Sequence, residues 1–266
     1  MDLARIARIP ERCRRDLRLI YMLENWREAL AAEWNRAPLS HVRLRNRVTL
    51  SGPETIDLAF LFHEIWVRQV YTPPGYEIRE GATVIDVGAN IGVFATYAAT
   101  RAEGVKVYAF EPFPDNVAWL RKNVEGSGLS NIRIFQQAVA GSTAKRFLES
   151  DPEDWIMHSL KEEKQDASSG IEVDCISLDD VMSREGIERC DLLKLDCEGS
   201  EYEILWNSSP DTLRRVRKIV AEFHEGPGRV STGRELRSYL ESKSFRVDRF
   251  HQDVNCGYMS AYNTAD

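Results

Sequence analysis

The sequence lacks any apolar run long enough to cross a bilayer, and its cysteines form no metal-binding pattern. A membrane-spanning helix needs about 20 consecutive apolar residues. The N-terminus is charged and has no apolar stretch of the kind found in signal peptides. The five cysteines are an odd number, and no two are spaced as Cys-x-x-Cys. These absences argue against a disulfide framework and a zinc cluster, and we expect a reducing, cytoplasmic location without a membrane span.

Acidic residues outnumber basic residues, with 42 Asp and Glu against 35 Lys and Arg. The net charge is −7, so overall electrostatics does not favour a nucleic-acid partner, and we expect none. The 266 residues and the hydrophobic content of 43% suit an ordinary globular core. This length permits one large domain, or one domain with an appendage.

The first 75 residues read differently from the rest. A basic, amphipathic segment over residues 1–36 predicts helix, residues 41–50 alternate as in a strand, and residues 56–71 predict a second helical stretch. Pro73, Pro74 and Gly75 end it. We expect an N-terminal helical and hairpin extension over residues 1–75 before a main domain over residues 76–266. The first helices suit packing on that domain with a solvated basic face. Contact with an anionic surface or a partner is the alternative, and the apolar stripe could serve a homodimer.

The stretch Thr83–Gly92 reads T-V-I-D-V-G-A-N-I-G, and the main domain is organised around it. Its β-branched start suits a strand buried on both faces. Gly88 and Ala89 open a short turn that ends at Gly92, and apolar residues at helical spacing follow. Glycines let such a turn close tightly and let a ligand approach the backbone. The pattern predicts a nucleotide-binding strand–turn–helix unit.

Two residues of this stretch decide between cofactors. A dinucleotide fingerprint has glycine at the position of Asn90, because a pyrophosphate needs bare backbone there. Asp86 lies just before the turn, where a carboxylate would repel phosphate and attract an ammonium or sulfonium group. S-adenosylmethionine (SAM) carries both cations and no phosphate, so the stretch favours SAM. An NAD-dependent enzyme and a turn without a ligand are the alternatives.

Two more strand ends are placed to complete a nucleotide site. The second predicted strand ends at Glu111 and Pro112, and an acid at that point of such a fold meets the ribose hydroxyls. The third predicted strand covers residues 132–139, with Gln137 and Ala138 near its end. We expect these two residues to contact the adenine.

A cluster of charge marks the end of a later strand. In Leu192–Glu201, period two places Lys194, Asp196 and Glu198 on one side of the strand and leucines on the other. Buried charges need partners, so three charged residues at one strand end are hard to explain by packing. We expect Asp196 and Glu198 to act in catalysis and Lys194 to contact the substrate.

Another predicted strand, Lys218–His224, ends with an acid and a histidine on the same side. A histidine oriented by a carboxylate is a usable general base near neutral pH, so Glu222 and His224 are candidate catalytic residues. A polar strand end bonded to nearby loops is the alternative. Together with Asp196 and Glu198 they could also hold a divalent cation, although we predict no metal.

Three aromatic residues outside these motifs are also candidates. Trp155 and His158 belong to an apolar segment within a polar stretch that we expect to help recognise the substrate. A structural role for the histidine is the alternative. Tyr71 falls just before the main domain, within reach of the cofactor, and a core or hinge role is the alternative.

With these pieces located, the chain resembles the FkbM family of SAM-dependent methyltransferases. The most specific matching block is K-L-D-C-E-G-S-E, and the glycine motif alone marks only the broader class. The resemblance covers about 140 residues and leaves residues 1–50 without a clear match. The matching stretches are V-I-D-V-G-A-N-I-G (Val84–Gly92), A-F-E-P (Ala109–Pro112), S-L-D-D-V (Ser177–Val181), L-L-K-L-D-C-E-G-S-E (Leu192–Glu201) and E-F-H (Glu222–His224).

The resemblance implies an α/β, Rossmann-like class I methyltransferase fold. We expect a mostly parallel, seven-stranded sheet with helices on both faces and an N-terminal helical extension. It also implies methyl transfer from SAM to a hydroxyl or carboxyl oxygen of a small molecule, a natural product or a sugar of a glycan, leaving S-adenosylhomocysteine. A non-catalytic SAM-binding protein is the alternative.

These expectations combine into one mechanism. Asp86 and the turn at residues 88–92 hold the methionine part of the cofactor, and Glu111 binds the ribose. Asp196 lies where cofactor and acceptor meet, and His224 removes the acceptor proton. Positioning supplies much of the acceleration, because effective molarity can contribute ~7–11 kcal/mol.

Overall fold

Seven strands form one sheet in the computed structural model, which describes residues 11–35, 37–151, 154–161, 170–224, 232–253 and 256–265. Numbered along the chain, they lie in the order 3-2-1-4-5-7-6. The first five are parallel neighbours, and the last strand is antiparallel to both strands beside it. This confirms the expected mostly parallel sheet. The strands are β3 (Thr83–Val87), β4 (Lys106–Phe110), β5 (Ile132–Phe135), β10 (Leu192–Leu195), β11 (Lys218–His224), β12 (Phe245–Gln252) and β13 (Cys256–Asn263).

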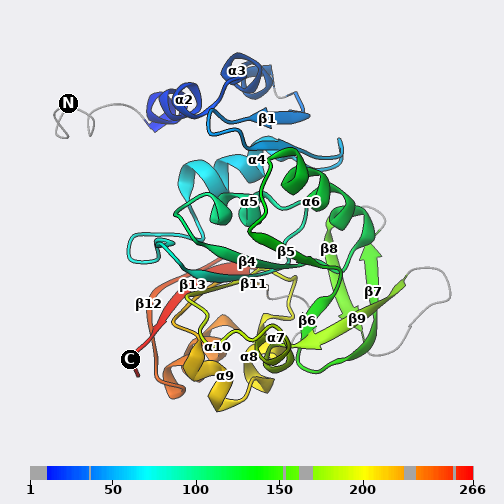
Figure 1. The fold of residues 1–266 in the computed structure, drawn as a ribbon, viewed down its shortest axis with the longest axis vertical. Coiled ribbons are helices and arrows are strands. Elements are labelled where there is room, and N and C mark those ends of the chain that lie inside the picture. The colour runs from blue at the N-terminus through cyan, green and yellow to red at the C-terminus, as the bar shows by residue number, and fades with distance from the viewer. Residues whose placement is uncertain are drawn as a thin grey trace.

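Helices cover both faces of this sheet, as Figure 1 shows. The central strand β3 explains why, because Val84 packs into one apolar core while Ile85 and Val87 pack into the other. A strand buried on both faces needs the nearly continuous apolar run that the sequence has. One face carries α5 (Val93–Ala99) and α6 (Pro114–Gly126), and the other carries α7 (Leu178–Arg184), α8 (Glu201–Asn207), α9 (Pro210–Arg215) and α10 (Gly233–Ser242).

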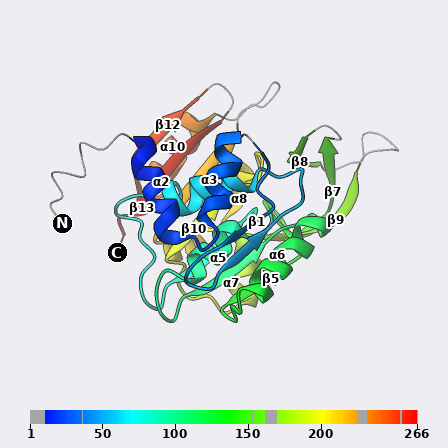
Figure 2. The same cartoon turned by 90° about the horizontal axis from the view of Figure 1, so that it is seen from above.

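The N-terminal segment lies over α5 and α6 (Figures 1 and 2). Its side chains belong to the same apolar core as the sheet, since Leu58, Phe62 and Trp66 are buried in one cluster with Val84. The Trp66 ring meets Tyr97 of α5 edge-on at 5.2 Å. The division at residue 75 and the homodimer stay predictions. The segment contains α2 (Glu11–Met22), α3 (Trp26–Asn35), β1 (His41–Arg43), β2 (Thr49–Ser51), α4 (Leu58–Phe62) and the π-helical turn η1 (His63–Arg68).

A second, four-stranded sheet interrupts the α/β alternation. It contains β6 (Ala138–Ala140), β7 (Ala144–Asp151), β8 (Asp154–Lys161) and β9 (Ile171–Ser177), in the order β6-β9-β7-β8. The expectation of one strand over residues 132–139 was wrong, because β5 ends at Phe135 and Ala138 already pairs with β9. β5 is an edge strand of the large sheet and pairs with β4, and the chain then continues into the second sheet. No helix in the described part of the chain is long and apolar enough to cross a membrane.

Candidate active site

The carboxyl ends of β3 and β10 meet at the point where the strand order reverses. The two strands pair in parallel, with Val87 opposite Leu195, so the turn after β3 lies against the chain that follows β10. In open α/β sheets this reversal point is where ligands bind. A cavity opens here between the sheet edge and the α4–η1 segment. Its walls include the turn residues 88–90 and Glu111, the ends of β10 and β11, and side chains of residues 56–71.

The glycine turn is shaped by close backbone contacts. Gly88 has φ +73°, and a Cβ atom there would lie 1.8 Å from the carbonyl oxygen of Asp196. Only glycine permits this approach of the two strand ends. Asn90 also has a positive φ, at 49°, and its side-chain oxygen accepts a hydrogen bond from the Ile91 amide at 2.8 Å. Asparagine tolerates the left-handed region, which explains its place here. Gly92 instead faces Leu120 of α6.

A buried ion pair fixes the base of the turn. The Lys194 ammonium lies 3.0 Å from Asp86 Oδ1 and donates to the Gly88 carbonyl at 2.7 Å. Burial by itself lowers the pKa of Lys194, but the charges of Asp86 and Asp196 raise it above its usual range, so the lysine stays charged. Asp86 is fully buried and does not line the cavity. Its predicted direct contact with a cofactor is therefore not supported, and it acts on the turn through Lys194.

The predicted ribose-binding acid is held rigidly. Glu111 is 5% exposed, and it accepts hydrogen bonds from the amides of Asn90 at 2.8 Å and Phe113 at 2.9 Å. The Asn116 amide group lies 3.4 Å from Oε1. Burial raises the pKa of the Glu111 carboxyl, while these backbone hydrogen bonds oppose the rise. With one amide bound to Oε2 and two donors at Oε1, the remaining acceptor capacity lies mainly at Oε2.

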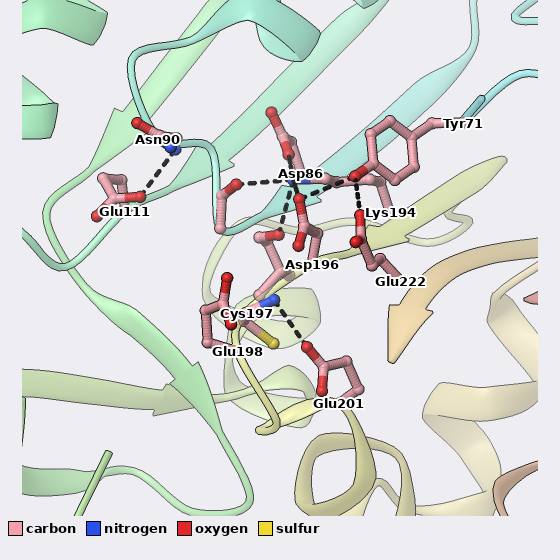
Figure 3. A network of polar contacts seen from close by, with 12 residues as sticks. Tyr71, Asp86, Asn90, Glu111, Lys194, Asp196, Cys197, Glu198, Glu201 and Glu222 are labelled. Carbon is pink, nitrogen blue, oxygen red and sulfur yellow. Dashed lines mark hydrogen bonds and ion pairs between the residues drawn. The ribbon is translucent and has the colours of Figure 1, made fainter. Parts of the chain in front are cut away.

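Two carboxylates in the wall of the cavity meet one phenol, and Figure 3 shows these contacts. The Tyr71 hydroxyl lies 2.9 Å from Asp196 Oδ2 and 2.9 Å from Glu222 Oε2. Asp196 Oδ2 is also 3.6 Å from the Lys194 ammonium. Burial, followed by the charges of Asp196 and Glu222, raises the pKa of Tyr71 well above its usual range. The phenol is therefore a permanent hydrogen-bond donor near neutral pH.

His224 is surrounded by acids. Its Nδ1 lies 3.4 Å from Oε1 of the fully buried Glu201, and its Nε2 lies 3.6 Å from Glu198 and 3.8 Å from Glu222. Burial lowers the pKa of His224, but hydrogen bonding and charge from Glu201, with the charge of Glu198, raise it to about 9. Burial raises the pKa of Glu198 to about 7 against the opposing charge of His224. His224 as a general base stays a prediction, and its pKa argues against that role at neutral pH.

The same cluster was the possible cation site. In the described part of the chain, ligand atoms of Asp196, Glu198 and His224 lie within 4.8 Å of one another. A protonated imidazole between these carboxylates already supplies a positive charge, and a metal would have to displace that proton. The geometry therefore favours His224 as the resident cation.

Most of the predicted site residues come together, and some do not. The cavity wall contains Ala89, Pro112, Ala138 and the four predicted catalytic residues. Gln137 does not line it, because the chain turns into the second sheet at that position. Trp155 and His158 lie in β8, and their side chains fall outside the described part of the structure.

The sequence reasoning missed part of the wall. Asn116 lies in the first turn of α6, and its amide group reaches Glu111 Oε1, but its sequence position alone did not indicate this contact. Tyr258 comes from the antiparallel strand β13, and no local motif marks it. Phe60, Leu61 and the other lining side chains of α4 and η1 carried no signal beyond helical periodicity.

The residues present fit a nucleoside with a positively charged sulfur. The turn at Gly88 has no room for a side chain, Glu111 offers an acceptor for a hydroxyl, and the far side of the cavity carries an excess of carboxylates. A sheet in the order 3-2-1-4-5-7-6, with these features at its reversal point, defines a Rossmann-like class I methyltransferase.

Comparison with known proteins identifies the family. The model of the methyltransferase FkbM domain matches residues 86–247. The chain is 30% identical over 234 residues to the 31-O-demethyl-FK506 methyltransferase FkbM of Streptomyces tacrolimicus, covering 77% of this chain and 88% of that protein. It is 29% identical to the AMB antimetabolite synthetase AmbE of Pseudomonas aeruginosa, over 80% of this chain and 12% of that protein.

A third relative is the hexuronic acid methyltransferase AglP of Haloferax volcanii, with 27% identity over 56% of this chain and 59% of that protein. The chain belongs to the FkbM family of methyltransferases. It is a methyltransferase, and SAM is its cofactor. The NAD-dependent alternative is therefore wrong.

Proposed function

We propose that this protein transfers the methyl group of SAM to an oxygen of a small molecule, a natural product or a sugar. The observation that carries the proposal is the set of proton acceptors around Tyr71, with Asp196 placed directly against the glycine turn. A hydroxyl must lose its proton when it is methylated, and carboxylates at that point can receive it. The names of two relatives, a 31-O-demethyl-FK506 methyltransferase and a hexuronic acid methyltransferase, agree with an oxygen acceptor.

The chain's own residues supply binding and orientation. The Gly88–Asn90 turn and Ala138 form the floor for the cofactor, Glu111 accepts a ribose hydroxyl at Oε2, and Lys194 holds the turn in place. SAM supplies an electrophilic methyl group and leaves as the neutral thioether. Asp196 lies at the junction with the acceptor. We invoke no metal in this arrangement, because a protonated His224 between Glu198 and Glu201 offsets part of their negative charge.

The acceptor side of the cavity is mainly apolar. Ile56, Phe60, Leu61 and Ile65 of the α4–η1 segment line it opposite the sheet edge. Apolar walls with few, well-placed polar groups are typical of small-molecule sites. We therefore favour an acceptor with an apolar body and one reactive hydroxyl or carboxyl group. Trp155 and His158 remain candidate substrate contacts.

Calorimetric titration with S-adenosylhomocysteine, with NADH as the comparison ligand, tests the proposal first. We expect micromolar binding of S-adenosylhomocysteine and none of NADH. Glu111→Gln keeps the size of the side chain and weakens acceptance of the ribose hydroxyl, so binding should fall about tenfold, for a loss of about 1.5 kcal/mol. An acceptor panel of hydroxyl and carboxyl compounds then follows. Preference for NADH, or methylation of amines alone, would contradict the proposal.

A further inference from the structure

Tyr71 occupies an unusual position between two acids. A phenol has one hydrogen and can donate it to one partner at a time. Yet its oxygen lies 2.9 Å from a carboxylate oxygen of Asp196 and 2.9 Å from one of Glu222. If both acids were ionised, one of them would point a lone pair at the lone pairs of the phenol. One additional proton turns both contacts into ordinary hydrogen bonds.

The surroundings decide which acid holds that proton. Asp196 lies 3.6 Å from the charged ammonium of Lys194, which favours the ionised carboxylate. Burial, followed by the charge of Asp196, raises the pKa of Glu222. His224 is 3.8 Å from Glu222 but closer to Glu198 and Glu201. The proton therefore belongs on Glu222, which donates to Tyr71, while Tyr71 donates to Asp196.

We propose that Glu222, Tyr71 and Asp196 form a proton-accepting chain that receives the hydroxyl proton of the acceptor. This inference rests on the proposed function and adds the path of the proton. The acceptor oxygen gains the methyl group, and the electron pair of the broken carbon–sulfur bond stays on sulfur. Binding of SAM sends the shared proton to solvent through the partly exposed side of Glu222. The hydroxyl proton then passes to Asp196, a proton moves from Asp196 to Tyr71, and the Tyr71 hydrogen moves to Glu222, so the product complex again holds one shared proton. Atoms and charge balance, because the sulfonium charge disappears as Glu222, Tyr71 and Asp196 together take up one proton.

Loss of the sulfonium charge also explains why the chain accepts a proton at the right moment. A positive charge beside Asp196 lowers the proton affinity of the whole chain, and its loss raises that affinity. The bound cofactor and its product differ by one methyl group and one charge. Binding of the two ligands should therefore release different numbers of protons from the site. The charged and titratable groups that face Glu222, Tyr71 and Asp196 come from several elements. They are Asp86, Lys194, Glu198, Glu201, His224, Cys256, Tyr258 and, from η1, Glu64.

The test compares dissociation constants of SAM and S-adenosylhomocysteine at pH 5.5 and pH 7.0. Both pH values lie below the pKa of the ligands' amino groups and below the pKa of His224. SAM expels the shared proton, so low pH opposes its binding, whereas the neutral product keeps the proton. With about half a proton released on SAM binding, the affinity of SAM relative to that of S-adenosylhomocysteine should rise about fivefold from pH 5.5 to pH 7.0. Calorimetry in two buffers of different ionisation enthalpy counts the protons directly.

Isosteric variants locate the proton. Glu222→Gln and Tyr71→Phe should each abolish most of the fivefold pH effect. Glu198→Gln is the matched control, because Glu198 has a pKa of about 7 and titrates beside the chain without touching Tyr71. It should keep the effect. A pH effect that is lost in Glu198→Gln, or kept in Tyr71→Phe, would overturn the inference. If neither ligand binds the wild-type protein, the proposed function itself fails, and the inference fails with it.

Discussion

At the scale of single residues, Gly88 shows how backbone geometry constrains this site. The residue has φ +73°, and its missing side chain lets the carbonyl of Asp196 approach the turn. The contact joins the end of β3, which carries the cofactor turn, to the end of β10, which is followed by Asp196. Substitution here should therefore affect both stability and binding.

Gly88→Ala should lower the free energy of unfolding by about 2–5 kcal/mol, because it combines a left-handed backbone with steric overlap. Gly128→Ala is the matched control, since Gly128 has φ +63° and nothing within 4 Å of an added Cβ. It should cost about 1–2 kcal/mol and leave S-adenosylhomocysteine binding unchanged. Urea unfolding and calorimetry measure both quantities. Equal costs in the two variants would show that overlap with Asp196 is unimportant.

At the scale of elements, Asn123 links α6 to two other parts of the chain. Its amide group donates to the carbonyls of Ser51 and Ile91 at 2.9 and 2.8 Å, and its oxygen accepts from the Ser51 amide at 2.8 Å. The side chain is 2% exposed. It thus connects β2 of the N-terminal segment, α6 and the cofactor turn through one fully used amide.

Asn123→Leu should cost about 2–5 kcal/mol of stability, because it leaves several buried backbone groups without partners. Asn207→Leu provides the control, since Asn207 is exposed and, among the described residues, its side chain hydrogen-bonds the Glu203 carbonyl of its own helix. Its cost should stay within about 0.5 kcal/mol. Unfolding midpoints in urea give both values. A loss below about 1 kcal/mol for Asn123→Leu would contradict this linking role.

Elements were predictable from sequence where local pattern decides them. The strand β11 has the bounds that its pattern predicts, and β4 ends directly before the predicted acid Glu111. The strand predicted over residues 132–139 was wrong, because its split between two sheets depends on which neighbours are available. Edge positions of this kind carry no local signal.

At the scale of the whole molecule, the N-terminal segment and the sheet share one core. Phe62 of α4 is 2% exposed and belongs to the cluster that contains Val84, whereas Phe60 of the same helix is 58% exposed. A shared core couples the two parts thermodynamically. The segment also carries Tyr71 to the acids of the site.

We therefore expect one cooperative unfolding transition, seen alike by circular dichroism and tryptophan fluorescence. Phe62→Ala should shift the whole transition, with a loss of about 3–5 kcal/mol. Phe60→Ala, in the same helix, should shift it by about 0.5 kcal/mol or less. Two separate transitions, with only the first changed by Phe62→Ala, would instead mark the segment as an independent unit.

The sequence by itself determined the features that local chemistry specifies. These are the strand–turn–helix unit at Thr83–Gly92, the acid after the second strand and the charged ends of β10 and β11. Only the tertiary structure decided their partners. Tyr71 meets Asp196 and Glu222 across 125 and 151 residues of sequence, and Asp86 turns toward Lys194 instead of the cavity. The acids around His224 raise its pKa. The reason is physical, because proton affinity and ion pairing depend on burial and on charges brought close by the fold.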